Sequence, residues 1–224
     1  MKHLPFTLLL ALTSLSSFAG DSSKELDERA DKAAKVLNSI SNELEIPRAM
    51  VNGGDCVAAV TIIKGGLMGI GAKSGQGLAT CKTKDGWSNP IVLNVNGANV
   101  GPQIGIGKSS MVMVFVGEKA VQQLKNKNMT GDMQLSFVAG PVGREAMAGV
   151  DFKLDNGIYS YSKAKGLYFG ATIGAAMISP DKSSNSALYS DIIDYNPSMI
   201  LETPASSDLP AAFQEFIEEL NKLG

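Results

Sequence analysis

The chain is short of the residues that active sites use most often. Its 224 residues include one histidine, His3, and two cysteines, Cys56 and Cys81. We expect His3 to be removed with a leader segment, and a chain without histidine cannot form a Ser-His-Asp triad, a Cys-His pair or a His-ligated zinc site. We therefore predict no catalytic residues, no metal and no cofactor.

The chain also lacks a strong net charge and a long apolar segment. Its formal charge is −2, which argues against a nucleic-acid partner. No apolar stretch approaches the roughly 18 residues that a membrane-spanning helix needs. Glycine is abundant instead, with 24 residues, and this favours tight turns and closely packed strands over a helical bundle. The length favours one domain.

The first 19 residues have the layout of a secretory signal peptide. Lys2 is followed by the short apolar run 6–12, and Ser17 and Ala19 place small residues at positions −3 and −1 of a cleavage site. The alternative is a frayed N-terminal helix. We predict a signal peptide over 1–19, a mature domain over 20–224, and a periplasmic or secreted protein that is peripheral to a membrane.

Two amphipathic helices are predicted at the ends of the mature chain. Ser22 and Glu25 fit a capping box, and apolar residues then recur every three or four positions, which predicts a helix over 22–44. Ser207 is the predicted cap of a C-terminal helix over 207–223.

The β-rich core is predicted between these helices, over 46–201, with a short central helix at 118–127. Glycine-rich turns at 64–66 and 74–77 indicate that the first three strands form a simple meander. The fold class is α+β, a single domain with a mostly antiparallel, curved or barrel-like sheet. The predicted strands are 57–63, 67–73, 78–82, 91–95, 103–107, 111–116, 133–139, 145–154, 158–162 and 166–178, and 180–207 is predicted as loop.

The two cysteines leave a disulfide open. An oxidising compartment favours a bridge between Cys56 and Cys81. In a three-strand meander, however, they would lie at opposite edges, about 20 Å apart at ~3.3 Å per residue, and a bridge needs Cα atoms within about 7 Å. A disulfide would therefore disprove the meander.

Charge is distributed unevenly along the mature chain. Residues 49–165 have a net charge of +5, whereas 20–48 and 166–224 have −2 and −6. A basic middle between acidic ends is a first indication of function, although composition alone favours an ordinary solvated surface.

Six stretches in this basic middle together resemble the SYLF domain, a lipid-binding family found in actin-patch and membrane-traffic proteins of eukaryotes and in exported bacterial proteins. The resemblance implies non-catalytic binding of anionic lipids, with phosphoinositides as the eukaryotic ligands and an N-terminal amphipathic helix assisting. Some members bind actin, a partner that we do not expect for an exported protein. The stretches are TIIKGG (61–66), GAKSGQG (71–77), DGWSNP (85–90), GPQIG (101–105), AGPVGR (139–144) and IYSYSKAKGL (158–167).

The chain departs from the family pattern at several positions. Asp55-Cys56 stands where Lys-Gly is usual, and Gly107 and Ser110 stand where a Glu and an Asp are expected. Ile173-Gly174-Ala175 replaces Leu-Glu-Gly. The loss of three acidic positions makes the middle of the chain more cationic.

The leading functional hypothesis is peripheral binding of anionic phospholipid headgroups in the bacterial envelope. A lysine near an anionic bilayer is worth about 1 kcal/mol, so several cations on one patch would give reversible, salt-sensitive adsorption. The alternative is an envelope protein-interaction module that uses a terminal helix for docking or forms a homodimer. The predicted lipid contacts are Lys64, Lys73, Lys108, Arg144, Lys163 and Lys165, with Tyr161 and Tyr168 as interfacial aromatic residues and Trp87 as a core residue.

Overall fold

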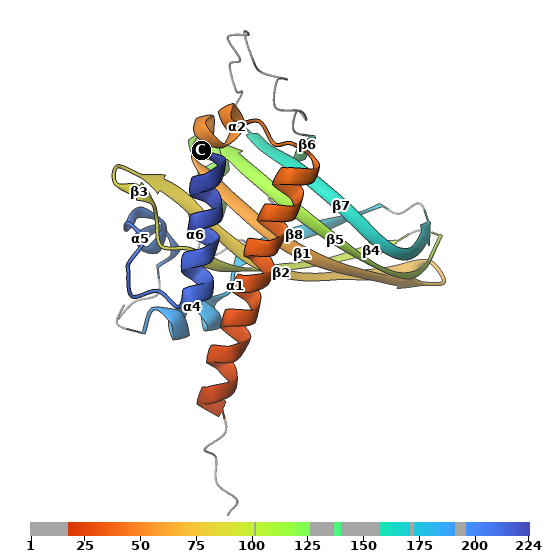
Figure 1. Ribbon diagram of the computed structural model, residues 1–224. Coiled ribbons are helices and arrows are strands. Elements are labelled where there is room, and N and C mark those ends of the chain that lie inside the picture. Colours follow the sequence, from red (N-terminus) through yellow and green to blue (C-terminus); the bar gives the residue numbers. More distant parts are fainter. Residues whose placement is uncertain (1–17, 101, 126–136, 140–156, 171–172, 191–195) are drawn as a thin grey trace, which may run out of the picture.

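A strongly curled β-sheet forms the centre of the computed structural model (Figure 1). The structure describes residues 18–100, 102–125, 137–139, 157–170, 173–190 and 196–224. The strands are β1 (Cys56–Leu67), β2 (Ile70–Thr83), β3 (Gly86–Trp87), β4 (Ile91–Val100), β5 (Gln103–Val116), β6 (Phe137–Ala139), β7 (Gly157–Gly170) and β8 (Ile173–Pro180). The helices are α1 (Phe18–Glu43), α2 (Arg48–Gly53), α3 (Glu118–Lys125), α4 (Lys182–Leu188), α5 (Pro197–Glu202) and α6 (Ala211–Leu223).

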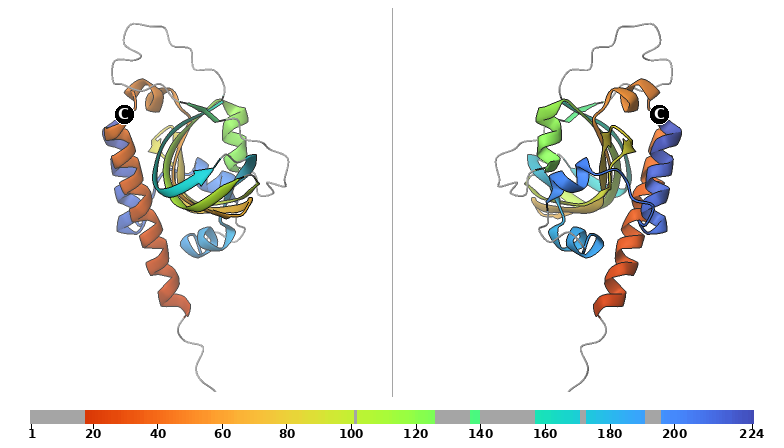
Figure 2. Two further views of the ribbon diagram at one scale, coloured as in Figure 1. Left: turned by 90° about the vertical axis from the view of Figure 1, so that its right-hand side faces the viewer. Right: turned by 90° about the vertical axis from the view of Figure 1, so that its left-hand side faces the viewer.

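The strand order is β6-β7-β5-β1-β2-β4-β8, with β3 beside β2. Every neighbouring pair is antiparallel except β6 and β7, which run parallel. The sheet curls round until it is nearly a ring when it is viewed along its length, but it stays open between its edge strands (Figure 2). The prediction of an α+β fold with a curved, mostly antiparallel sheet is confirmed.

The helices that the structure describes cover only one end of the sheet. On the outer, convex face, α1 and α6 lie side by side and bury one hydrophobic core, to which Leu37, Phe213 and Phe216 contribute (Figures 1 and 2). Inside the curl, α3 and α5 pack on a second core against the concave face. We call this half of the sheet the covered end, and the opposite half, with the tip of the β1–β2 hairpin, the end of β4 and the start of β5, the bare end.

The predicted meander is wrong, because the first three predicted strands form one hairpin. β1 and β2 pair without interruption from Cys56 opposite Cys81 to Leu67 opposite Ile70. The turn consists of Met68 and Gly69, both with positive φ (52° and 94°), as a tight two-residue hairpin turn requires. Cys56 and Cys81 are bridged by a disulfide, as their place in this pairing allows.

The glycines that indicated turns lie inside the strands instead. A Cβ atom at Gly77 would lie 2.1 Å from the carbonyl oxygen of Ala59 on the neighbouring strand, and one at Gly75 would lie 2.4 Å from that of Thr61. These residues are therefore glycine because the backbone of β1 approaches them closely.

Other boundaries also differ from the predictions. The strands predicted at 103–107 and 111–116 are one strand, β5, and the predicted loop at 180–207 contains α4 and α5. α1 begins at Phe18, so Ser22 lies inside the helix and not at its start, and α6 begins after Pro210 and not at Ser207. The predicted strand 145–154 and all but two residues of the signal peptide lie outside the described residues.

Candidate functional site

Four lysines form a band across the middle strands, where the covered end gives way to the bare end. Lys64 of β1 lies opposite Lys73 of β2, and Lys108 of β5 lies opposite Lys165 of β7. Because Lys108 pairs with Ile63, the two lysine pairs differ by one position along the strands, or about 3.3 Å. We call Lys64, Lys73, Lys108 and Lys165 the lysine band.

The lysine band has members on both faces of the sheet. Residues directly opposite each other share a face, and successive residues alternate. Lys108 and Lys165 therefore project from the convex face, where both are exposed, whereas Lys64 and Lys73 project from the concave face and are partly buried. The prediction of one shared patch is thus replaced by two pairs at one level of the sheet.

No acidic residue neutralises the band from within the sheet. None of the strands that the structure describes contains an Asp or Glu. The acidic partner found nearby comes from a helix, since Glu43 at the end of α1 forms an ion pair with Lys163 of β7. Lys163 is one step closer to the covered end than Lys165, on the same face. The ion pair with Glu43 therefore involves neither Lys108 nor Lys165, and these two lysines keep the convex face cationic at the level of the band.

A small cavity opens between α1 and the convex face beside this band. It has a volume of about 120 Å³ and combines ammonium groups with two hydroxyl groups. Charged and hydroxyl donors that converge on one cavity suit the oxygens of a phosphate group. The lining residues are Ser39, Ile40, Lys108, Ser110, Lys163 and Lys165. The sequence indicated the lysines but not the hydroxyls, since only the register of β5 and the position of α1 bring Ser39 and Ser110 to them.

The remaining predicted site residues divide into three cases. The prediction for Tyr161 as an interfacial residue is wrong: its side chain is 1% exposed under α1, and burial raises the pKa of its hydroxyl. Trp87 is 9% exposed in the core, as predicted. Arg144 lies outside the described residues, and so does the side chain of Tyr168, whose backbone pairs with Gly105.

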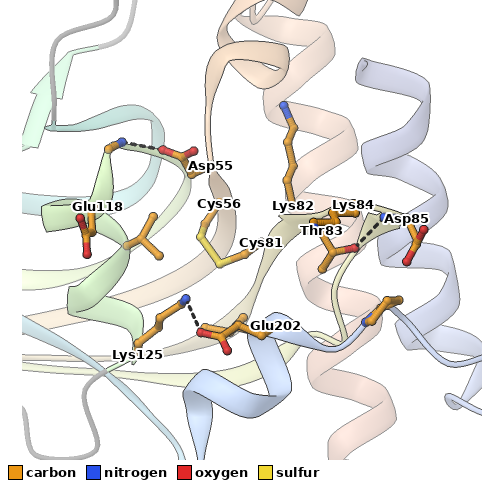
Figure 3. A pocket seen from close by; sticks show the side chains of 14 residues that line it. Asp55, Cys56, Cys81, Lys82, Thr83, Lys84, Asp85, Glu118, Lys125 and Glu202 are labelled. Atoms are coloured by element: carbon orange, nitrogen blue, oxygen red, sulfur yellow. Dashed lines mark hydrogen bonds and ion pairs between the residues drawn. A yellow bond between two sulfur atoms is a disulfide. The ribbon is translucent and has the colours of Figure 1, made fainter.

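A larger cavity of about 590 Å³ lies at the covered end, next to the disulfide (Figure 3). Its charged groups are of both signs and several bind one another or the backbone. Lys125 forms an ion pair with Glu202 at 2.7 Å, and Asp55 accepts a hydrogen bond from the Gly117 N–H at 2.6 Å. Lys82 donates to the carbonyls of Val51 and Asn52. These interactions join α2 to β2, α3 to α5, and the segment before β1 to that before α3, so this cavity has a structural explanation.

The helix-mediated alternative depended on an exposed apolar helix face. Both predicted stripes are buried, with Leu37 and Ile40 of α1 and Phe213 and Leu220 of α6 each at 0% exposure. The two helices pack on each other and on the sheet, and this removes the surface that the alternative needed on them. Among the described residues no helix is long and apolar enough to cross a membrane, and no group of potential metal ligands is present.

The fold and the lysine band define a small α+β domain with a cationic surface across a curled sheet. Comparison with known families matches residues 96–223, more than half of the chain, to the Ysc84 family, described as "Las17-binding protein actin regulator". The chain belongs to this family, which is the one that contains the SYLF domain predicted from the sequence. The family description names a binding protein and regulator, not an enzyme.

Characterised relatives are longer than this chain. It is 26% identical to the human SH3 domain-containing YSC84-like protein 1 over 211 residues, which cover 89% of this chain and 61% of the relative. It is 28% identical to Protein YSC84 of Saccharomyces cerevisiae over 75% of this chain and 38% of the relative. Against SH3 domain-containing protein PJ696.02 of Schizosaccharomyces pombe the identity is 30%, over 73% and 40%. The chain thus matches less than two thirds of each relative, and no solved structure matches it.

Proposed function

We propose that this chain binds anionic phospholipid headgroups at a membrane surface in the bacterial envelope, without catalysis. The lysine band in strands free of carboxylates is the observation that supports this function best. Four lysines at about 1 kcal/mol each give roughly 4 kcal/mol, which corresponds to reversible binding near the millimolar range. This attraction decays over a Debye length of about 10 Å at 0.1 M salt, so binding weakens as salt rises.

The cavity beside Lys108 supports headgroup binding over attraction to a charged surface alone. Lys108, Lys163 and Lys165 provide ammonium donors there, and Ser39 and Ser110 provide hydroxyl donors. Because Glu43 already forms an ion pair with Lys163, a phosphate in this cavity would contact mainly Lys108 and Lys165. Headgroup phosphate and free phosphate present the same oxygens, so the experiment must separate the two.

The test is co-sedimentation with vesicles of phosphatidylglycerol or phosphatidylcholine over a series of salt concentrations. We expect capture by phosphatidylglycerol vesicles that falls as salt rises, and little capture by phosphatidylcholine. Replacing two lysines, as in Lys108→Gln with Lys165→Gln, removes about 2 kcal/mol and should weaken binding about thirtyfold. Millimolar inorganic phosphate should compete only if the cavity accepts the free ion.

The matched control changes the same charge at the covered end. Lys84 and Lys119 are exposed there, and Lys84→Gln with Lys119→Gln should leave binding close to that of the unmodified protein. Equal recovery from both vesicle types would overturn the proposal. An equal loss in the control pair would reduce it to attraction by net charge.

A protein partner is the second candidate function, and the names of the relatives favour it. The family description refers to Las17 binding and actin regulation. A related yeast protein is called LAS seventeen-binding protein 3. For this chain, such a partner would be a protein of the compartment to which the predicted signal peptide directs it, so we do not propose actin. A partner that competes with vesicles for the lysine band would favour this candidate.

A further inference from the structure

The bare end of the sheet exposes large apolar side chains that nothing in the described chain covers. Five of them lie toward the bare ends of β1, β2, β4 and β5, the sixth is Met68 in the β1–β2 turn, and each is at least 59% exposed. Exposed apolar patches of this kind mark interaction surfaces in soluble proteins. We call this set the apolar end: Leu67, Met68, Ile70, Val100, Ile104 and Ile106.

The strand register places these side chains on one face. Leu67 lies opposite Ile70, and Ile70 lies opposite Val100, so these three share the convex face. Ile106 pairs with Gly65, two positions before Leu67, and Ile104 lies two positions beyond Ile106, so both are on that face as well. The small residues Gly65, Ala72 and Ala98 lie between them and form a shallow apolar surface.

The convex face is layered along the strands. Under α1 and α6 it is buried and apolar, as at Val112 of β5. Next follow Ser110 and then Lys108, which is level with Lys165, and beyond them only Ile106 and Ile104. The distance along β5 from Lys108 is about 7 Å to Ile106 and about 13 Å to Ile104. On the convex face, Lys108 and Lys165 therefore lie between the part of the sheet that α1 and α6 cover and the apolar end.

We propose that the apolar end inserts into the outer hydrocarbon layer of an anionic bilayer while the lysine band lies at the level of the headgroups. An interfacial element buries its apolar face about 5–10 Å into the boundary between headgroups and acyl chains, which matches the spacing along β5. The inference rests on the proposed function and adds a mode of attachment to it. In this mode of attachment the sheet contacts the membrane, and α1 stays packed on the protein core.

The positive charge of the lysine band favours an anionic bilayer over a second copy of the chain as the partner of the apolar end. A twofold contact between two apolar ends would bring two lysine bands close together. None of the described strands contains a carboxylate to separate the bands. An anionic bilayer instead offers hydrocarbon to the apolar end and phosphate to the lysines.

The fluorescence of a tryptophan placed at the apolar end can detect insertion. Leu67→Trp puts the probe at the hairpin tip, and Met199→Trp puts the same probe at a comparably exposed methionine of α5, at the covered end. With phosphatidylglycerol vesicles, emission from Leu67→Trp should shift to shorter wavelength and be quenched by lipids brominated in the upper acyl chain. Emission from Met199→Trp should not change, and the buried Trp87 gives a constant background in both.

A second measurement separates insertion from attraction to headgroups. Ile104→Ser with Ile106→Ser should lower vesicle binding about a hundredfold and remove the part that survives high salt. Urea midpoints should confirm that this variant stays folded, because both side chains are exposed.

The possible outcomes are distinct. If the protein sediments with anionic vesicles but Leu67→Trp stays accessible to water, insertion is wrong and headgroup binding stands. If neither the unmodified protein nor any variant binds anionic vesicles, the proposed function and the insertion are both wrong. If Leu67→Trp emission is already shifted without vesicles, and the mass in solution falls to that of a monomer in Ile104→Ser with Ile106→Ser, a second copy covers the apolar end and the inference is overturned.

Discussion

The two ends of the sheet consist of the same strands, yet the described helices cover only one of them. In β1, Val57 and Ala59 are 0% exposed under α1, whereas Ile63 and Leu67 of the same face are 55% and 61% exposed. β5 shows the same contrast between Val112 and Ile106. Both strands therefore carry apolar side chains on this face at either end. The helices decide which apolar residues form the core and which remain as a surface.

The two ends also differ in the interactions that stabilise them. The covered end has two helix layers and the Cys56–Cys81 disulfide. It also has an ion pair between Arg29 of α1 and Asp181, the residue before α4, at 2.8 Å. Among the described residues, the bare end has backbone pairing and the tight tip of the β1–β2 hairpin. Stability should therefore depend on the covered end and membrane binding on the bare end.

The largest expected effect tests this division in the core. Phe213 is 0% exposed between α6 and the sheet, and Phe213→Ala should lower the free energy of unfolding by about 3–5 kcal/mol because it leaves a cavity. Ile70, which is 72% exposed at the bare end, is the matched site. Ile70→Ala should change the free energy of unfolding by less than about 0.5 kcal/mol. Urea unfolding monitored by circular dichroism measures both, and similar losses would mean that the bare end is packed against something in solution.

A smaller effect should separate two glycines of the β1–β2 hairpin. A Cβ atom at Gly77 would meet the Ala59 carbonyl at 2.1 Å, so Gly77→Ala should destabilise the protein by about 1–3 kcal/mol. At Gly65, near the tip, the nearest atoms are 4.0 Å away, and Gly65→Ala should be neutral or stabilise by up to about 0.5 kcal/mol. The same urea experiment applies, and a loss at Gly65 as large as at Gly77 would refute a loosely packed tip.

These glycines also show where prediction from the sequence stopped. The apolar stripes of the terminal helices, the short central helix and the α+β class followed from local periodicity. Gly65 and Gly75 predicted turns because the sequence cannot distinguish a glycine that bends the chain from one that lets a neighbouring strand approach. That single ambiguity produced the wrong meander and the argument against the disulfide between Cys56 and Cys81.

The candidate site was predictable in its charges but not in its arrangement. Lys108 and Lys165 are far apart in sequence, and only the pairing of β5 with β7 places them opposite each other. The exposure of Ile104 and Ile106 could not be inferred, because alternating apolar residues in a strand normally indicate a buried face. The α4 and α5 helices were missed because they are short, although Asp181 and Asn196 both cap a helix and Pro197 follows Asn196, the usual signals of a helix start.

The smallest expected effect concerns acid, and it again separates the two ends. Burial alone would raise the pKa of Asp181, but hydrogen bonds from the Ser184 N–H, from Ser183 and from Arg29 outweigh it and hold the pKa at about 2. Because this value lies below the 3.8 of an unperturbed aspartate, the carboxylate stabilises the folded state at neutral pH, and this contribution is lost as the pH falls from about 5 toward 2.

Asp181→Asn keeps a good N-cap but removes the charge that Arg29 needs. Urea midpoints at pH 6 and pH 3 should therefore fall less steeply with acid in this variant than in the unmodified protein, by about 1 kcal/mol at most. The described strands of the bare end contain no carboxylate, so a Lys108→Gln variant should keep the full acid dependence of the unmodified protein. If the pH dependence of the urea midpoint is unchanged in Asp181→Asn, the acid-sensitive contacts lie elsewhere. The Arg29–Asp181 pair would then not contribute to the stability of the covered end.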